Sequence, residues 1–244
     1  MYQGDSRLAT IDRKKAEARL DLGVNFNEWG SARIGVLGGT VKRELDTGTL
    51  PFPVDSDNIT LGAYSARLIF DQLDSVHFPR DGWKFDASYL KSDTGLGADV
   101  SYTKWGASGS FVRSFGEHTF NLYAAAGDLS GSKISPAYDQ IAWGGFLALS
   151  GYATGQLLGE NLKYGRAMYY HRLARSPIFE GAYGGISLET GKMSRPVIAS
   201  NRDDWIQAAS VFVAADTPLG PAYLGYGQAQ DGPSSFYFYL GRPF

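Results

Sequence analysis

The sequence predicts an all-β fold, a transmembrane antiparallel β-barrel of about twelve strands, of the kind found in the bacterial outer membrane. Three observations lead to this prediction. Apolar and polar residues alternate along many segments, short and long connections follow each other in turn, and the final segment is rich in alternating aromatic residues. The 244 residues, with a formal net charge of −2, fit one barrel domain over residues 1–244.

Alternation with a period of two is the main evidence. In residues 17–27, Leu20, Leu22 and Val24 fall on one face of a strand, and charged residues fall on the other. A soluble β-sandwich would also alternate. A charged inner face favours a barrel, because a wet lumen can accept it. We expect the lumen to receive polar side chains that include Arg19, Asp21, Arg67 and Asp71.

Composition excludes several other classes of protein. No run approaches the roughly 18 consecutive apolar residues that a transmembrane helix needs. The near-neutral charge and the absence of basic runs give no reason to expect nucleic-acid binding. With no cysteine and only three scattered histidines, the sequence predicts no metal site and no cofactor.

The connections between the expected strands alternate in length, as periplasmic turns and extracellular loops do in outer-membrane barrels. The short ones are Asn27–Ser31, Asp74–Gly82, Ser114–Thr119, Ala174–Ile178 and Asp216–Pro221. The longer or more polar ones are Glu44–Asn58, Lys91–Asp99, Leu129–Asn161, Gly191–Asp204 and Gln228–Ser235.

This pattern predicts twelve strands, seven before the longest connection and five after it. An even count would return the C-terminus to the side where the chain begins. Since a bilayer does not tolerate unpaired sheet edges, we expect one chain to close the barrel at twelve strands. The alternatives are missing upstream strands, or a homodimer in which two chains share one barrel. The expected strands are Ser6–Arg13, Glu17–Asn27, Ala32–Arg43, Leu61–Gln72, Trp83–Leu90, Val100–Arg113, Phe120–Gly127, Leu162–Leu173, Phe179–Glu189, Trp205–Ala214, Ala222–Gly227 and Ser235–Arg242.

The C-terminal segment resembles the strand by which outer-membrane proteins are recognised for assembly. Phe236, Phe238 and Leu240 alternate with other residues, and the aromatic Phe244 ends the chain. We therefore expect outer-membrane lipids and the barrel assembly machinery as partners. A buried edge strand at the end of a soluble domain would show the same pattern.

Several segments resemble the Omp85 superfamily, and within it the C-terminal barrels of patatin-like phospholipases of type V secretion. The resemblance covers most of the chain, and the turn Asp216–Pro221 is its most specific part, similar to the family's D-T-P-x-G-P turn. The other segments are Trp29–Gly35, His77–Trp83, Gly144–Tyr152 and Leu188–Gly191.

The resemblance implies that loop 129–161 folds into the lumen. Its tip resembles the family's apolar-Arg-Gly-aromatic motif, but Ser150 stands where the family has arginine, and serine cannot form a bidentate ion pair. Glu189 resembles the family's lumenal acidic residue, to which Ser150 could offer one hydrogen bond. Arg166 and Arg172 are other candidate partners. The motif residues are Gly144, Gly145, Leu149, Ser150, Gly151 and Tyr152.

The resemblance further implies a translocator or membrane anchor for a lipase-type passenger domain that this chain lacks. The alternative function is a pore for small solutes or ions. Catalysis by this chain is not expected, because Gly106–Ser110 does not match the G-x-S-x-G lipase motif. The histidines His77, His118 and His171 belong to no catalytic motif.

Overall fold

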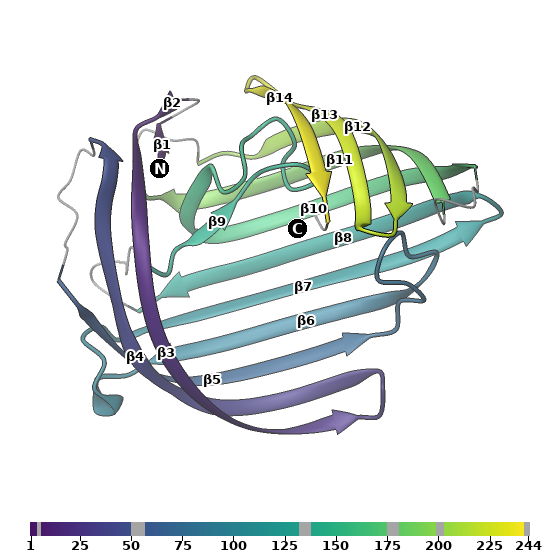
Figure 1. Cartoon of the computed structure of the whole chain (residues 1–244). Helices are drawn as coiled ribbons and strands as arrows, with labels where there is room; N and C mark the ends of the chain where they lie inside the picture. The colour runs from purple at the N-terminus through teal and green to yellow at the C-terminus, as the bar shows by residue number, and fades with distance from the viewer. Residues whose placement is uncertain (4–5, 50–56, 132–137, 175–180, 199–202, 242–244) are drawn as a thin grey trace.

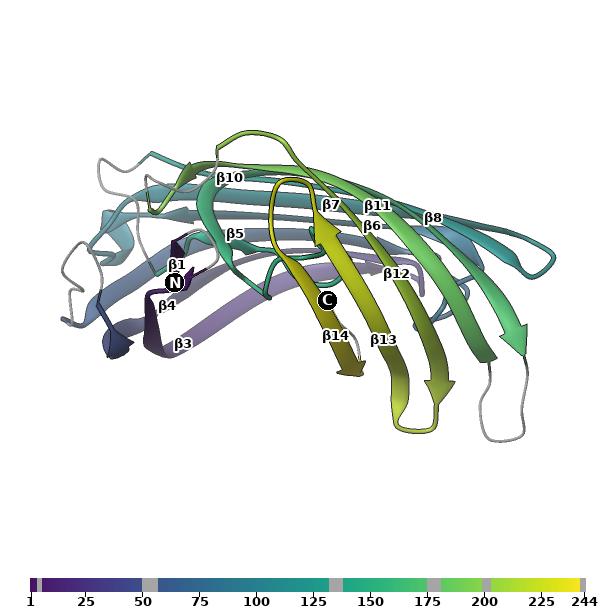
Figure 2. The same ribbon diagram turned by 90° about the horizontal axis from the view of Figure 1, so that it is seen from above.

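A computed structural model describes residues 1–3, 6–49, 57–131, 138–174, 181–198 and 203–241. These residues form one twelve-stranded antiparallel sheet that curls toward a barrel (Figure 1 and Figure 2). A separate pair of two-residue strands, β1 (Tyr2–Gln3) and β2 (Ser6–Arg7), precedes it. The strands of the sheet are β3 (Ala9–Phe26), β4 (Gly30–Gly48), β5 (Ile59–Asp71), β6 (Asp81–Ser92), β7 (Tyr102–Phe115), β8 (His118–Ser130), β9 (Ile141–Trp143), β10 (Leu157–Ala174), β11 (Gly181–Pro196), β12 (Ile206–Thr217), β13 (Gly220–Ala229) and β14 (Ser234–Leu240).

The number of strands agrees with the prediction, but two of the strands differ. The segments expected as Ser6–Arg13 and Glu17–Asn27 belong mainly to one strand, β3, which pairs with β4 without a break from Ile11 to Phe26. The short strand β9, inside the longest connection, is the twelfth. Six strands of the sheet therefore precede β9 and five follow it.

This difference changes where the two termini lie. Each long strand runs antiparallel to the one before it. We call the end of the sheet with the long connections the loop end, and the opposite end the turn end. The described chain begins at the loop end and β14 finishes at the turn end (Figure 1). The expectation that the C-terminus returns to the starting side is therefore wrong.

The sheet is open between its first and last strands. Its order runs from β14 through β13, β12, β11, β10, β8, β7, β6, β5 and β4 to β3, so β3 and β14 are the two edges. Within the described residues, no pairing joins these edges. The expected closure at twelve strands by one chain is thus not found.

The outer face of the sheet is apolar. Leu20 and Leu22 of β3, Leu188 of β11 and Phe236 and Phe238 of β14 are all more than half exposed on this face. Such a band is what the lipid-facing side of an outer-membrane barrel requires. At the turn end, aromatic rings stack outside the sheet, as in the aromatic girdles of such barrels; they are Phe26, Trp29, Phe70 and Trp83.

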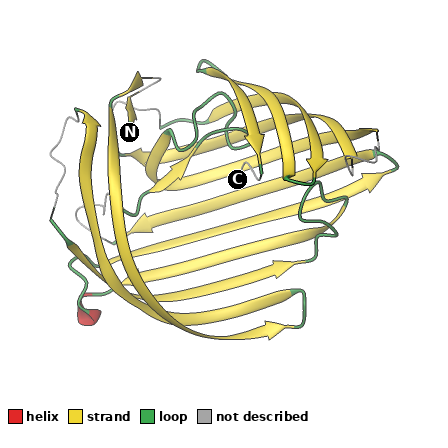
Figure 3. Ribbon diagram, in the orientation of Figure 1, coloured by secondary structure: helices red, strands yellow, loops and turns green. Residues whose placement is uncertain are grey.

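The buried core lies inside the curl, between the inner face of the sheet and the connections that fold into it. All three buried clusters include residues of loop 129–161. In two of them these residues pack mainly on strands β10 to β14. In the third, Leu129 and Tyr138 pack at the loop end of β4, β5 and β7. Among the described residues, the one helix is the short 3-10 turn η1 (Thr94–Leu96), shown in Figure 3. In that part of the chain, no helix is long and apolar enough to cross a membrane.

Candidate functional site

The loop tip, which we define as residues 144–155 between β9 and β10, lies inside the lumen against β10 to β14 (Figure 1). Its apolar side chains Phe146, Leu147 and Leu149 are buried. Gly144 and Gly145 have φ angles of +109° and +119°, a backbone conformation that glycine adopts without steric cost. The sequence therefore folds this segment as an ordered insertion with its own core contacts.

The centre of the site is the carboxylate of Glu189, which projects from β11 into the loop tip. Its Oε2 accepts the backbone N–H groups of Leu149 at 2.6 Å and Ser150 at 2.8 Å. Its Oε1 accepts the hydroxyls of Ser150 at 2.7 Å and Ser187 at 2.5 Å. Ser150 is 0% exposed and Glu189 is 4% exposed, so water takes little part in this arrangement.

The backbone of the tip is shaped to present its N–H groups to this anion. Leu147 and Leu149 have φ angles of +58° and +72°, in the left-handed region. Successive residues of alternating handedness form an anion-binding concavity called a nest. The left-handed conformation costs roughly 1–2 kcal/mol for a residue with a side chain. Charge-assisted hydrogen bonds of the Glu189 carboxylate offset that cost, since each stabilises by about 1.5–3 kcal/mol.

Two phenols and an arginine hold the rest of the tip. The Tyr237 hydroxyl accepts the Gly151 N–H at 2.7 Å and donates to the Tyr152 carbonyl at 2.7 Å. The Leu147 carbonyl accepts hydrogen bonds from the Tyr164 hydroxyl at 2.8 Å and from Nη1 of Arg166 at 2.7 Å. The tip is therefore joined to β10, β11 and β14.

Arg166 also supplies positive charge beside the buried carboxylate. Arg166 on β10 and Glu189 on β11 are direct partners in the register of the two strands. The guanidinium lies over the Tyr123 ring, 5.2 Å from its centroid. A buried carboxylate is tolerated where hydrogen bonds and a nearby cation compensate for lost hydration.

Two glycines of β13 leave room for the tip. A Cβ atom at Gly227 would lie 2.5 Å from Cβ of Ser150, and one at Gly225 would lie 2.5 Å from the Phe146 ring. Both separations are shorter than real Cβ contacts, so a side chain there would push the tip away from the wall. The wall and the tip are thus matched in shape as well as in charge.

The first described residues of the loop, 138–143, contact the opposite wall. Nζ of Lys104 on β7 lies 2.8 Å from Oδ1 of Asp139, and the Tyr102 hydroxyl lies 2.9 Å from Oδ2. On β3, Nη1 of Arg13 donates to the Tyr138 carbonyl at 2.7 Å. Since the tip is held by β10, β11 and β14, residues 138–155 cross the lumen and join its two sides.

A second segment folds into the lumen at the turn end. The turn-end connection, residues 72–80 between β5 and β6, places Phe78 against aromatic rings of the far wall. The Phe78 ring stacks on Tyr183 at 4.1 Å between centroids and lies 5.3 Å from the Tyr223 ring. Nδ1 of His77 lies 3.2 Å from Oδ1 of Asp216. This segment was expected as an ordinary short turn, and its inward fold is a finding of the structure.

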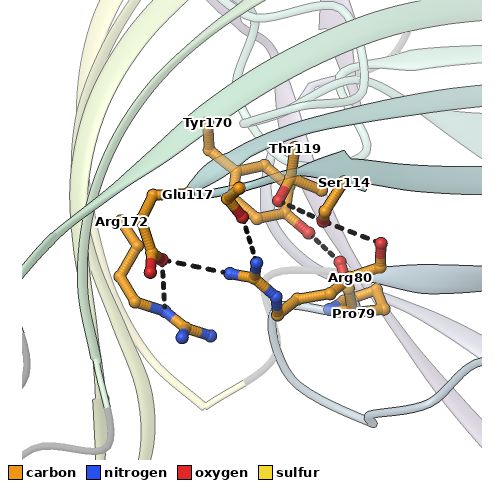
Figure 4. Close-up of polar contacts among 8 residues, drawn as sticks. Pro79, Arg80, Ser114, Glu117, Thr119, Tyr170 and Arg172 are labelled. Atoms are coloured by element: carbon orange, nitrogen blue, oxygen red, sulfur yellow. Dashed lines mark hydrogen bonds and ion pairs between the residues drawn. The ribbon is translucent and has the colours of Figure 1, made fainter.

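Polar contacts extend from this connection to β7, β8 and β10 (Figure 4). Arg80 pairs with Glu117 at 3.3 Å, and Glu117 also lies 3.6 Å from Nε of Arg172. The Tyr170 hydroxyl donates to the Pro79 carbonyl. Arg172 was a candidate partner for the loop tip, but the structure places it at the turn end, so that expectation is wrong.

The two inward segments leave open space between them and the β3–β8 wall. One cavity of about 910 Å³ lies between the loop tip and the turn-end connection. Another, of about 840 Å³, lies along β3 to β8 on the loop side. Both cavities are bordered by Asp86, Ser108, Tyr123 and Trp143, so they adjoin. The described part of the loop therefore crosses the lumen without filling it.

The remaining candidate residues are distributed around this space. Arg19, Asp21 and Arg67 line the loop-side cavity. Asp71 forms an ion pair with Lys84 at 2.6 Å on the wall of the other cavity. Of the C-terminal set, Phe236, Phe238 and Leu240 point outward and are 83%, 74% and 56% exposed. Phe244 lies outside the described residues.

Some residues of the site were not predicted from the sequence. Tyr237 alternates with Phe236 and Phe238, so its inward direction could have been deduced from the pattern. Ser187 precedes Glu189 by two residues and shares its face, which was also a usable signal. Among the residues that the structure describes, no group of three or more His, Asp or Glu side chains could hold a metal ion.

Comparison with known proteins gives a match in structure alone. No family model matches the sequence, and no curated protein does. Among solved structures, the crystal structure of BamA from Haemophilus ducreyi lacking POTRA domains 1–3 matches with a TM-score of 0.77 and 15% sequence identity. The match covers 97% of this chain and 56% of that one, so the chain spans little more than half of the BamA chain. The fold is therefore an antiparallel all-β sheet like that of the BamA barrel.

Proposed function

We propose that this chain is an outer-membrane barrel of the Omp85 type that serves as translocator or membrane anchor for a lipase-type passenger. The observation that carries the proposal is the loop tip held by Glu189 inside a BamA-like sheet. An inward loop at this place is what the sequence resemblance implies. The apolar outer face supports a location in the outer membrane.

The passenger part of the proposal is supported by sequence resemblance to patatin-type barrels. The turn Asp216–Pro221 forms the tight hairpin that this resemblance implies: Thr217 pairs with Gly220, whose φ is +104°. The loop would order the lumen during passage or anchoring, because it joins both walls.

Membrane location is tested by giving the chain an export signal and separating the bacterial membranes. Recovery in the outer membrane would support a folded barrel, provided that unheated and boiled samples of the protein migrate differently on a denaturing gel. Recovery only in the soluble fraction would refute the proposal.

The passenger role is tested by joining a lipase-type domain and a periplasmic adaptor ahead of Met1. Surface protease accessibility of the lipase measures export, and lipase activity in washed outer membranes measures anchoring. We expect both with the unchanged barrel, and a loss of export with Glu189→Gln. The control Glu160→Gln removes a carboxylate of β10 that pairs with Arg195 at 2.8 Å, away from the tip. A lipase that is neither exported nor retained by the unchanged barrel would contradict the proposal.

A further inference from the structure

Two histidines lie side by side on the outer face of the sheet, at its turn end. His118 is the first residue of β8, and His171 on β10 is its direct partner in the antiparallel register. His118 is exposed and in step with the outward-facing Phe120. The ring centroids of the two histidines are 4.6 Å apart. The pair was not expected from the sequence, because the longest connection separates the two residues and only the pairing of β8 with β10 brings them together.

The ring nitrogens of this pair have few partners within the protein. Nδ1 of His118 lies 2.7 Å from the Tyr169 hydroxyl. Nδ1 of His171 is buried and has no hydrogen-bond partner among the described residues. In native proteins a buried polar atom in this position usually has a partner. Neither ring contacts a carboxylate of the described part of the chain, so a ligand does not compete with an ion pair for these nitrogens.

The spacing of the two rings suits a metal ion that both of them bind. Directly opposite residues of an antiparallel pair have Cβ atoms about 4.5–5.5 Å apart, so both side chains reach one point above the sheet. With metal–nitrogen bonds of about 2.0–2.1 Å, two imidazoles at right angles around one ion have centroids roughly 4.5 Å apart. The observed separation of 4.6 Å agrees with that geometry.

Tyr169 orients one of the two rings for this role. Its hydroxyl can accept the Nδ1 proton of His118, which leaves the lone pair of Nε2 for a metal ion. Histidines that bind metals commonly donate their other ring N–H to such a partner, which fixes the tautomer and the direction of the ring. The Tyr169 ring also stacks on that of His118, at 5.9 Å between centroids.

We infer that His118 and His171 form a binding site for a divalent transition-metal ion on the outer face of the sheet. Imidazole suits Cu²⁺, Ni²⁺ and Zn²⁺, and Cu²⁺ binds most tightly in this series. The protein supplies two ligands and solvent completes the coordination. The bound ion links β8 to β10 at the end of the sheet opposite the long loop that connects them. Both strands lie in the middle of the sheet, so the site depends neither on its open edges nor on the passenger role.

Electron paramagnetic resonance of Cu²⁺ added to the purified full chain, prepared without an affinity tag, tests the site directly. The chain has three histidines, so the number of coordinating imidazole nitrogens identifies the ligands. We expect a spectrum with two imidazole nitrogens, and the same spectrum in the control His77→Asn, which keeps the pair intact. A spectrum with one such nitrogen or none, or loss of the second nitrogen in His77→Asn, would overturn the inference.

Calorimetric titration with Cu²⁺ measures what each residue contributes. Loss of a residue that orients a ligand costs about 10- to 100-fold in metal affinity. Tyr169→Phe should therefore weaken binding by about tenfold and keep both imidazole nitrogens in the spectrum. His171→Asn removes a ligand and should weaken binding by about 100-fold or more. Equal affinity in the unchanged chain and in His171→Asn would show adventitious binding only, which would also overturn the inference.

Discussion

Replacing Glu189 by glutamine is the most direct test of how the loop tip is held. The change keeps the shape of the side chain and removes its charge. Four hydrogen bonds of 2.8 Å or less end on this carboxylate, two from backbone N–H groups and two from hydroxyls, and the Tyr164 hydroxyl adds a longer one at 3.4 Å. The amide can keep its oxygen toward the N–H groups and donate to the hydroxyl oxygens of Ser150 and Ser187. The number of bonds is then preserved, and what is lost is the contribution of the charge.

The size of that loss follows from the difference between charged and neutral hydrogen bonds. A bond to a charged group stabilises by about 1.5–3 kcal/mol and a neutral one by about 0.5–1.5 kcal/mol. The loss is roughly 1 kcal/mol for each bond, or about 4 kcal/mol for the set. A neutral amide is less costly to bury than a carboxylate, which offsets part of it. We expect Glu189→Gln to destabilise the closed tip by about 2–3 kcal/mol, which is roughly a 30- to 140-fold change in its opening equilibrium.

Amide hydrogen exchange measured by mass spectrometry reads this equilibrium at the tip itself. Peptides that contain the Leu149 and Ser150 amides should exchange roughly 30- to 140-fold faster in Glu189→Gln, by the same conversion of free energy. Glu160→Gln, which removes a partly exposed ion pair with Arg195, should leave these peptides unchanged. Exchange at the unchanged rate in Glu189→Gln, or an equal increase in both variants, would refute the claim that the charge of Glu189 holds the loop tip.

Three further changes test the packing around the two inward segments. Gly227→Ala places a Cβ 2.5 Å from Cβ of Ser150 and should lower the free energy of unfolding by about 1–3 kcal/mol in urea titrations; Gly165→Ala, whose Cβ has 3.9 Å of clearance, should not, and equal effects would contradict this. Tyr237→Phe leaves the Gly151 N–H and the Tyr152 carbonyl without their shared hydroxyl and should cost about 1–3 kcal/mol by the same titration; an unchanged midpoint would show that the phenol is dispensable. Phe78→Ala removes a buried ring from the turn end and should cost about 3–5 kcal/mol, with faster exchange in residues 72–80; unaltered exchange there would show that the ring does not hold the connection.

The sequence predicted those features that repeat along a strand and therefore place their side chains on one face of it. Alternation around Leu20 and Leu22 correctly predicted the outer apolar face, and the carboxylate of Glu189, which we expected in the lumen, accepts the hydroxyl of Ser150 at the loop tip. The break expected before Glu17 was wrong, because β3 stays paired with β4 through Lys14 and Lys15, where consecutive charged residues interrupt the alternation but not the strand.

Two features could not be deduced from the sequence for physical reasons. The donors that hold Glu189 are mainly the backbone N–H groups of Leu149 and Ser150, and every residue except proline carries such a group. The inward fold of residues 72–80 depends on Phe78 meeting Tyr183, far away along the chain. A local pattern contains no information about that contact.

The two open edges of the sheet have unequal lengths, and this limits what could seal them. Strand β3 has 18 residues and β14 has seven. A strand that crosses the hydrocarbon core needs about 9–11 residues, so β14 is too short to cover the part of β3 that lipid would face. Each backbone group left unsatisfied in lipid costs several kcal/mol. Zipping β14 onto β3 would therefore leave part of the β3 edge unpaired. In a bilayer this edge favours any strand that covers more of it, because each newly paired backbone group removes one such cost.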